Sequence, residues 1–421
     1  MEPNDIRARI EHMAQAAKAA SRKLAIMPAR QKDLCLEAMS QQLLDREHEI
    51  LEANAKDIEA GQERGLTSAL LDRLELTPKR IASMAKGLNE LLGLSDPVGE
   101  VTATWIRPNG LTIRRVRIPI GVIAIIYESR PNVTVDSAGL CLKVGNAVFL
   151  RGGSEAFHSN SALARVLVEA GAKHGLPEGA VQLVPFRDRE AIDAMLKLDP
   201  YIDLVIPRGG EGLIKKVASE STIPVIKHYK GVCHVYVDKA ADPDMALDIV
   251  ENAKCQRPGV CNAAETVLIH RDIAQTFVPA LADRLRNRGV ELRGDPEFRR
   301  LDPRATPATE QDWYEEYLDL ILAARIVDDV TQAVEHITQY GSAHSDAIVT
   351  ADKETAQTFK QTVDSAAVYV NASTRFTDGG QFGMGAEIGI STDRIHARGP
   401  MGVEELTTYK YVVDGTGQIR E

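Results

Sequence analysis

A cysteine beyond a tight turn is the residue in this sequence best suited to nucleophilic chemistry. Cys261 follows a Pro-Gly turn and precedes an apolar run at 266–269 that predicts a β-strand. A thiol in such a position is partly exposed and can face backbone N–H groups, which favour the reactive thiolate. Lys254 and Arg257 are expected to add positive potential nearby. The alternative for any single cysteine is a small buried hydrophobic residue, and most cysteines are of that kind.

The other four cysteines fit that alternative better. Cys35, Cys141 and Cys233 lie in apolar patterns. Cys255, at the end of a predicted helix, is the weaker candidate for a nucleophile. The five cysteines are widely scattered, with no CxxC pair and no zinc-ligand spacing. We therefore expect neither a disulfide framework nor a bound metal.

An asparagine after the most hydrophobic predicted strand could stabilise an oxyanion. Asn132 lies in YESRPNVT at 127–134, where a helix should begin. From its position alone, capping that helix is the better interpretation. The alternative is a side-chain amide that donates a hydrogen bond to an oxyanion.

Two glycine-containing junctions could hold phosphate groups. RGGSE at 151–155 and RGGEG at 208–212 each follow an apolar run and precede a predicted helix. Backbone N–H groups at a helix N-terminus bind phosphate well, and Arg151 or Arg208 could add a charged contact. Ordinary turns between a strand and a helix use the same glycines. The presence of both junctions favours a dinucleotide site.

The elements that must position these residues alternate between strand and helix. Residues 1–100 carry helical periodicity, and PNG at 108–110 marks a tight hairpin turn. From residue 121 onward, predicted strands and helices alternate, and a second series of alternating strands and helices begins near residue 238. Such alternation predicts parallel sheets with helices on both faces. The sequence therefore predicts two α/β domains preceded by an unusually early hairpin.

Composition narrows the class of protein. The chain has 421 residues, 44% hydrophobic and 26% charged, which is typical of a globular protein with two or three domains. No apolar run approaches the ~20 residues that span a bilayer. The N-terminus carries no signal-peptide pattern, so a cytoplasmic location is expected. With 50 basic and 60 acidic residues, a net charge of −10 argues against a nucleic-acid binder.

Several common catalytic motifs are missing. The sequence contains no GxxxxGK[ST], no GxSxG, no HExxH and no GxGxxG after a strand. A P-loop kinase, an α/β-hydrolase and a zinc protease of the HExxH type are therefore poor interpretations. A conventional Rossmann dehydrogenase is weakened on the same grounds.

Five segments together resemble the gamma-glutamyl phosphate reductase family, within the aldehyde dehydrogenase superfamily. The resemblance covers essentially the whole chain, and its motifs are specific to that family. The segments are QRPGVCNAAE at 256–265, YESRPNVTVDSAGL at 127–140, FLRGGSEA at 149–156, YGSAHSDAIVT at 340–350 and GISTDRIHARGPMGVEELTTYKY at 389–411.

The resemblance implies an aldehyde dehydrogenase-like α/β fold with two doubly wound domains and a small β oligomerisation element. The implied segments are 1–101 and 122–237 for a dinucleotide-binding domain, 238–399 for a catalytic domain with the nucleophilic cysteine, and 102–121 and 400–421 for a bridging element. In the superfamily such an element joins subunits. Since its apolar side chains cannot be buried in a lone ribbon, a homodimer or higher homo-oligomer is expected.

The resemblance also assigns residues. Cys261 is expected as the nucleophile and Asn132 as an oxyanion donor. The cofactor is expected to be NADP (NADPH), held by a second set of residues. These are Arg151 on the adenosine side, Ser154 near the ribose, Gly209 and Gly210 near the phosphates, and Glu316 at the nicotinamide ribose.

One departure bears on the chemistry. Hydrolytic aldehyde dehydrogenases carry a glutamate general base in a segment whose counterpart here is IKHYKG at 226–231, which has no carboxylate. That base is needed only to hydrolyse a thioester with water. Its absence favours acyl-phosphate chemistry. A hydrolytic NAD-dependent aldehyde dehydrogenase is the nearer alternative, and it would act without phosphate. A catalytically silent binding subunit is the more distant one, and the presence of both Cys261 and Asn132 argues against it.

The expected reaction is the NADPH-dependent reduction of L-glutamyl 5-phosphate to L-glutamate 5-semialdehyde and phosphate, through a thioester on Cys261. This step belongs to proline biosynthesis, which implies a functional link to glutamate 5-kinase. The substrate carries a phosphate and a carboxylate, so arginine forks are expected. Arg257 and Arg375 are the candidates, with a surface salt bridge as the equal alternative for each.

Overall fold

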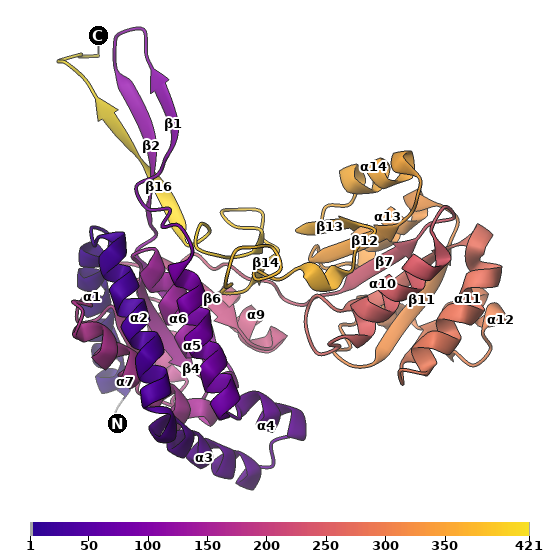
Figure 1. Ribbon diagram of the computed structural model, residues 1–421, viewed down its shortest axis with the longest axis horizontal. Coiled ribbons are helices and arrows are strands. Elements are labelled where there is room, and N and C mark those ends of the chain that lie inside the picture. Colours follow the sequence, from indigo (N-terminus) through magenta and orange to yellow (C-terminus); the bar gives the residue numbers. More distant parts are fainter. Residues whose placement is uncertain (1–2, 421) are drawn as a thin grey trace. The chain divides into compact units, whose positions relative to one another are not determined.

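The computed structural model describes residues 3–420, apart from a few side chains, and divides into two compact units (Figure 1). Unit 1 comprises Met1–Lys227, Gly383–Gly389 and Met401–Glu421, and unit 2 comprises His228–Phe382 and Ile390–Pro400. Within the described residues, no helix is both long and apolar enough to cross a membrane.

Unit 1 begins with a helical layer, as the periodicity predicts. Its helices are α1 (Pro3–Leu24), α2 (Ala29–Asp45), α3 (Glu47–Glu63), α4 (Ser68–Leu74) and α5 (Pro78–Leu92). The start of α5 is set by Thr77, whose side chain accepts a hydrogen bond from the Arg80 N–H, with proline at the first helical position. The apolar stripe of α5 then packs against α2 and α6 (Asn132–Lys143).

A parallel sheet forms the centre of unit 1. Its strands are β3 (Val122–Tyr127), β4 (Ala147–Gly152), β5 (Val181–Leu183) and β6 (Leu204–Arg208), in the order β5-β4-β3-β6. Every residue of β3 is buried, so helices must cover both faces of the sheet. The helices that follow these strands are α6, α7 (Phe157–Ala172), α8 (Glu190–Met195) and α9 (Glu211–Glu220).

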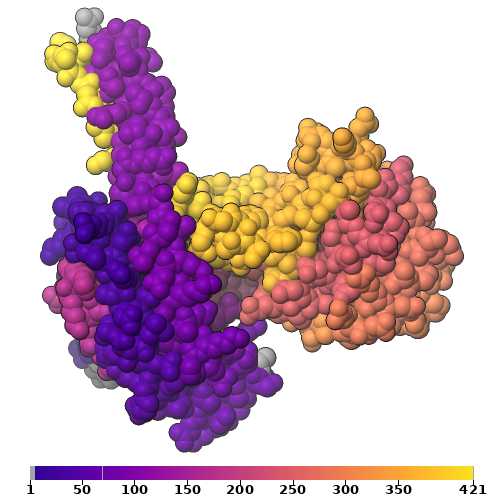
Figure 2. Space-filling view, viewed as in Figure 1, coloured from indigo at the N-terminus to yellow at the C-terminus, as the bar shows by residue number. Residues whose placement is uncertain are grey.

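A second sheet in unit 1 is antiparallel and largely exposed. The hairpin of β1 (Val101–Ile106) and β2 (Thr112–Pro119) is joined by β16 (Thr407–Asp414), which pairs with all eight residues of β2. Figures 1 and 2 show these three strands extending beyond the packed helices of unit 1. The expected two-stranded hairpin and C-terminal strand are therefore one three-stranded sheet within the chain.

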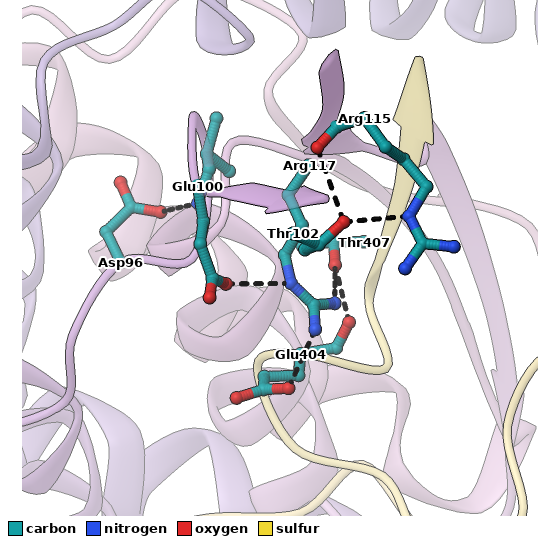
Figure 3. A network of polar contacts seen from close by, with 8 residues as sticks. Asp96, Glu100, Thr102, Arg115, Arg117, Glu404 and Thr407 are labelled. Atoms are coloured by element: carbon teal, nitrogen blue, oxygen red, sulfur yellow. Dashed lines mark hydrogen bonds and ion pairs between the residues drawn. The ribbon is translucent and has the colours of Figure 1, made fainter. Parts of the chain in front are cut away.

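Arg117 on β2 fixes the C-terminal strand to the hairpin (Figure 3). Its guanidinium donates to Glu100 on one side, at 3.0 Å, and to Glu404 and Thr407 on the other, at 3.0 and 3.2 Å. Arg115 makes a parallel contact, since its Nε donates to Thr102 Oγ1 at 2.8 Å. Charge-assisted hydrogen bonds from β2 thus reinforce the base of the three-stranded sheet.

Unit 2 is built on a seven-stranded parallel sheet. Its strands are β7 (Cys233–Val237), β8 (Ala264–His270), β9 (Glu291–Gly294), β10 (Thr306–Pro307), β11 (Ile321–Val327), β12 (Ser345–Val349) and β13 (Ala367–Val370), in the order β10-β9-β11-β8-β7-β12-β13. The helices are α10 (Pro243–Cys255), α11 (Arg271–Arg286), α12 (Pro296–Leu301), α13 (Val330–Tyr340) and α14 (Lys353–Thr362). A short antiparallel pair, β14 (Ile390–Ser391) and β15 (Gly399–Pro400), also belongs to this unit.

Two features of the chain differ from the sequence expectation. β7 was expected in the first domain, but it pairs with β8 and β12 in the second sheet, so the units divide after Lys227. The apolar run at 224–226 predicts a further strand, but this segment contributes only the single bridge between Val205 and Val225. Both differences arise because short apolar runs next to each other in sequence do not reveal which sheet each one joins.

Candidate active site around Cys261

Cys261 lies in unit 2, in the loop that joins α10 to β8, and is half-buried. The loop is held by close backbone contact from one neighbouring segment. A Cβ atom at Gly231 would lie 1.8 Å from the Cys261 carbonyl oxygen, so only glycine fits there. The Cys233 thiol also donates to that oxygen, with Sγ 3.2 Å away. The backbone of the nucleophile candidate is therefore fixed while its side chain stays accessible.

The next residue, Asn262, anchors the same loop from the other side. The Asn262 Nδ2 donates to the Thr377 carbonyl oxygen at 2.8 Å. The Thr374 hydroxyl donates to the carbonyl oxygen of Asn262, also at 2.8 Å. Arg375 donates to the Asn262 side-chain oxygen through Nη1. The short helix η3 (Thr374–Phe376) thereby clamps the turn that carries Cys261.

The two predicted substrate arginines lie in this unit. Arg375 also donates from Nε to Gln256 Oε1 at 2.9 Å, while Arg257 is exposed. Burial and then the neighbouring charge of Arg257 lower the pKa of Arg375. Two arginines that repel each other beside Cys261 are suited to an anionic ligand. Within residues 3–420, neither of them forms the surface salt bridge that was the alternative.

Lys254 does not supply the positive potential that the sequence suggested. It is fully buried, and its Nζ donates to Glu265 Oε2 at 2.6 Å, with that carboxylate equally buried. Burial raises the pKa of Glu265 to about 8, against the opposing effect of Lys254. The hydrogen bond ties the end of α10 to the start of β8 and gives the buried lysine the partner that a buried charge requires.

Two histidines beside Cys261 were missed by the sequence reasoning. Ligating atoms of His228, Cys261 and His344 all lie within 4.8 Å of one another. The His344 ring is completely buried, and its Nδ1 lies 2.8 Å from Ser345 Oγ and 3.7 Å from Cys233 Sγ. His228 and His344 are far from Cys261 in the sequence, and only the sheet order brings them together.

The other four thiols are held in the protonated form. Burial raises the pKa of Cys35 to about 11, and it also raises the pKa of Cys141 and Cys233. The pKa of Cys255 is raised by burial and by Glu251. Cys35, Cys141 and Cys233 are buried, as the sequence predicted, and all five cysteines are free.

Asn132 lies in unit 1, at the first residue of α6, and does not cap that helix. Its Nδ2 donates to Asp136 Oδ2, one turn further on, at 2.9 Å, and its side chain is exposed. The capping position belongs to Pro131, which has no side chain that can cap. Burial raises the pKa of Asp136 to about 6. The capping interpretation of Asn132 is thus wrong. Its amide is exposed and is oriented by the Asp136 carboxylate.

Arg151 and Ser154, the expected residues for the adenosine side, lie at the end of β4 in unit 1. The Arg151 guanidinium is buried and donates to the carbonyl oxygens of Gly152 and Arg187, at 2.9 and 3.1 Å. Its Nε has no hydrogen-bond partner within the described residues. Ser154 begins the short helix η1 (Ser154–Ala156) and is half-buried.

Gly209 and Gly210 lead into α9, and a carboxylate occupies the start of that helix. The Gly210 N–H donates to Glu128 Oε2 at 3.0 Å, and a Cβ at Gly209 would lie 2.4 Å from the same oxygen. An anion at the first turn of α9 is what the helix dipole favours, and the Glu128 carboxylate supplies it here. A phosphate at this position would have to displace the Glu128 side chain.

Glu316, the expected partner of the nicotinamide ribose, lies in unit 2 beside the Cys261 loop. Its Oε1 accepts a hydrogen bond from the Gly231 N–H at 2.9 Å. Gly231 in turn contacts the Cys261 carbonyl oxygen, so Glu316, Gly231 and Cys261 form one connected group. The predicted site residues therefore fall into two sets. Cys261, Arg257, Arg375 and Glu316 are in unit 2, and Asn132, Arg151, Ser154, Gly209 and Gly210 are in unit 1.

The fold and these residues define a known class of protein. Residues 3–323 match the model of the aldehyde dehydrogenase family, and the chain belongs to that family. The chain is 58% identical to a gamma-glutamyl phosphate reductase of Moorella thermoacetica, over 98% of this chain and 99% of that protein. It superposes on the crystal structure of gamma-glutamyl phosphate reductase from Thermotoga maritima with a TM-score of 0.96, at 49% identity, covering 98% of this chain and 100% of that one.

A more distant structure shows the same fold. An acetylating aldehyde dehydrogenase from Geobacillus thermoglucosidasius superposes with a TM-score of 0.72 at 18% identity, covering 100% of this chain and 99% of that one. The aldehyde dehydrogenase-like fold expected from the sequence is confirmed.

Proposed function

We propose that this chain reduces L-glutamyl 5-phosphate to L-glutamate 5-semialdehyde and phosphate, with NADPH as the reductant and Cys261 as the nucleophile. The names of its near full-length relatives support the substrate and the reaction. The observation that supports acyl-phosphate chemistry is the lack of a carboxylate in the segment before β7, residues 226–231. Where hydrolytic members of the family need a carboxylate, this segment supplies His228, which lies next to the thiol.

The covalent step uses residues of unit 2. The Cys261 thiolate attacks the γ-carbonyl carbon, the bond from that carbon to the phosphate oxygen breaks, and inorganic phosphate leaves with the electron pair. A γ-glutamyl thioester remains on Cys261, so one difficult reduction becomes two easier steps. One of the two neighbouring imidazoles, that of His228 or that of His344, is proposed to accept the thiol proton. Arg257 and Arg375 are proposed to bind the phosphate and carboxylate of the substrate.

Reduction of the thioester completes the cycle. NADPH, when bound, supplies the hydride. The Asn132 amide, together with the Cys261 backbone N–H, is proposed to stabilise the oxyanion that forms at the former carbonyl. When this oxyanion collapses, the bond from carbon to sulfur breaks, the aldehyde leaves and the thiolate returns. Since no water is consumed, no general base for hydrolysis is required.

The family implies a nicotinamide cofactor, and NADP is proposed over NAD. Arg151 with its unused Nε donor and Ser154 are proposed to contact the ribose and its phosphate. Gly209 and Gly210 at the start of α9 are proposed to receive the diphosphate, and Glu316 the second ribose.

The cellular setting is proposed on chemical grounds. An acyl phosphate is a reactive product of a kinase acting on a carboxylate, which implies a functional link to glutamate 5-kinase. Five free thiols agree with a reducing, cytoplasmic location.

Assay of the reverse reaction tests this proposal. The purified protein is given glutamate 5-semialdehyde and NADP⁺ or NAD⁺, with and without inorganic phosphate, and NADPH or NADH formation is followed by absorbance. We expect turnover with NADP⁺ that depends strictly on phosphate. Sustained turnover without phosphate would favour the hydrolytic alternative. A preference for NAD⁺ would overturn only the choice of cofactor.

A further inference from the structure

Three metal-ligating side chains meet at the amino ends of three neighbouring strands of unit 2. His228 precedes β7, Cys261 precedes β8, and His344 directly precedes β12. The strands lie side by side in the order β8-β7-β12 and are parallel, so their amino ends share one edge of the sheet. The sheet order thus creates a cluster for which the sequence spacing gives no signal.

We propose that His228, Cys261 and His344 bind a zinc ion, which reversibly blocks the nucleophilic thiol. Two imidazoles and one thiolate form a set of soft and borderline ligands that selects zinc over magnesium or calcium. Three protein ligands leave a fourth position for water or for an oxygen of the substrate. Nothing in the proposed reductase reaction uses this ion, so the site would act as an inhibitory switch on Cys261.

The spacing of the ligand atoms is compatible with closure on an ion. All three atoms lie within 4.8 Å of one another. In a tetrahedral zinc site, nitrogen and sulfur ligands lie about 3.3–3.6 Å apart, given bond lengths near 2.0 and 2.3 Å. Movement of about 1 Å is therefore needed. His228 is half-buried on an irregular segment, and a rotation of its side chain can provide that movement.

The buried ligand is already oriented by groups behind it. His344 Nδ1 lies 2.8 Å from Ser345 Oγ, which in turn lies 2.6 Å from Thr377 Oγ1. The Tyr369 hydroxyl lies 2.7 Å from the same Thr377 Oγ1. Metal-binding histidines usually have one ring nitrogen bonded in this way, which fixes the orientation of the ring. The backbone of Cys261 is fixed as well, by Gly231 and the Cys233 thiol.

Protection of the thiol from alkylation tests the proposal without measuring reductase activity. The full-length protein is treated with iodoacetamide at increasing zinc chloride concentrations, and modification of the Cys261 peptide is followed by mass spectrometry. We expect zinc to slow this modification by at least about 10-fold, with one ion bound per chain and full reversal by EDTA. A failure here leaves the proposed reductase function untouched, because that reaction is assayed without zinc.

Variants identify the ligands. His228→Asn, on the half-buried segment, and His344→Gln, at the buried position, should each raise the half-protecting zinc concentration by at least about 10-fold. Each variant is compared with its own zinc-free alkylation rate. His48→Asn, exposed on α3, and Cys255→Ser should protect like the parent protein. Unchanged protection in both His228→Asn and His344→Gln, or no protection of the parent protein at all, would overturn the proposal.

Discussion

Cys261 differs from the other thiols in its surroundings rather than in its local sequence. Cys255, six residues earlier, also precedes a turn, but burial and Glu251 raise its pKa. Cys261 lies close to the imidazoles of His228 and His344, and Arg375 lies near it with Arg257, a setting suited to an anionic substrate.

We therefore predict that Cys261→Ser abolishes turnover, whereas Cys255→Ser retains most of it. A serine hydroxyl is a far weaker nucleophile than a thiolate, and no other residue in the proposed mechanism can form the thioester. Steady-state rates in the reverse direction measure both variants, and circular dichroism checks their folding. An inactive Cys255→Ser protein beside an active Cys261→Ser protein would contradict the assignment.

Asn132 is the second test at the scale of single residues. The Asn132 amide donates to Asp136 and does not cap the helix, so its loss should cost little stability. Since the amide is proposed as an oxyanion donor, Asn132→Ala should lower the rate of the chemical step by about 10²–10³-fold, the usual effect of losing one such donor. Thr77→Ala, which removes a true helix cap, is the matched control and should instead cost about 1 kcal/mol of unfolding free energy. Single-turnover kinetics and urea unfolding separate the two effects. If Asn132→Ala behaved like Thr77→Ala, Asn132 would be structural.

At the scale of elements, the segment before β7 holds the Cys261 loop in place. Gly231 touches the Cys261 carbonyl oxygen and donates its N–H to Glu316, so it links two proposed site residues. A methyl group here cannot be accommodated without moving the loop, since a Cβ would lie 1.8 Å from a backbone oxygen.

Gly231→Ala is predicted to lower the unfolding free energy by about 1–3 kcal/mol, the usual cost of overpacking, and to slow alkylation of Cys261. Gly212→Ala is the matched control, because nothing lies within 4 Å of its Cβ position and alanine is the better residue inside α9. Urea denaturation and iodoacetamide kinetics measure both variants. Equal stability and equal thiol reactivity of the two would show that the contact at Gly231 does not position the loop.

Local patterns predicted the elements well, and non-local pairing explains what they missed. Neighbouring residues account for the helices within residues 3–92, the turn before Cys261 and the buried strand β3. The partners of Cys261 do not, because His228 and His344 reach it only through the order β8-β7-β12. The burial of Lys254 against Glu265 likewise depends on how α10 meets β8. Such contacts are set by crossover connections, which periodicity does not encode.

At the scale of the whole molecule, the three-stranded sheet presents unburied apolar side chains. On β16, Tyr409, Tyr411 and Val413 are each more than half exposed, at 52%, 56% and 53%. Ile106 on β1 is 76% exposed. Both β1 and β16 are edge strands of this sheet, and such edges tend to pair with another chain. We propose that this sheet joins two copies of the chain.

Sedimentation at micromolar concentration should therefore show a homodimer or a higher oligomer, and deletion of residues 409–421 should produce monomers. The cut lies beyond Leu406, which is fully buried and whose carbonyl oxygen accepts from Asn146, so that the core of unit 1 is spared. Glu37→Lys, on the exposed part of α2, is a control for a change of surface charge. A monomeric parent protein, or a truncated protein that keeps its oligomeric state, would contradict the proposal.

The central claim is that an acyl group passes through Cys261 and leaves to phosphate rather than to water. Mixing the protein with glutamate 5-semialdehyde and excess NADP⁺ in phosphate-free buffer tests it directly. We predict a burst of one NADPH per chain, then arrest, with the mass of one γ-glutamyl group on the Cys261 peptide, and renewed turnover when phosphate is added. Continuous NADPH formation without phosphate, or a burst with no adduct on Cys261, would contradict the account.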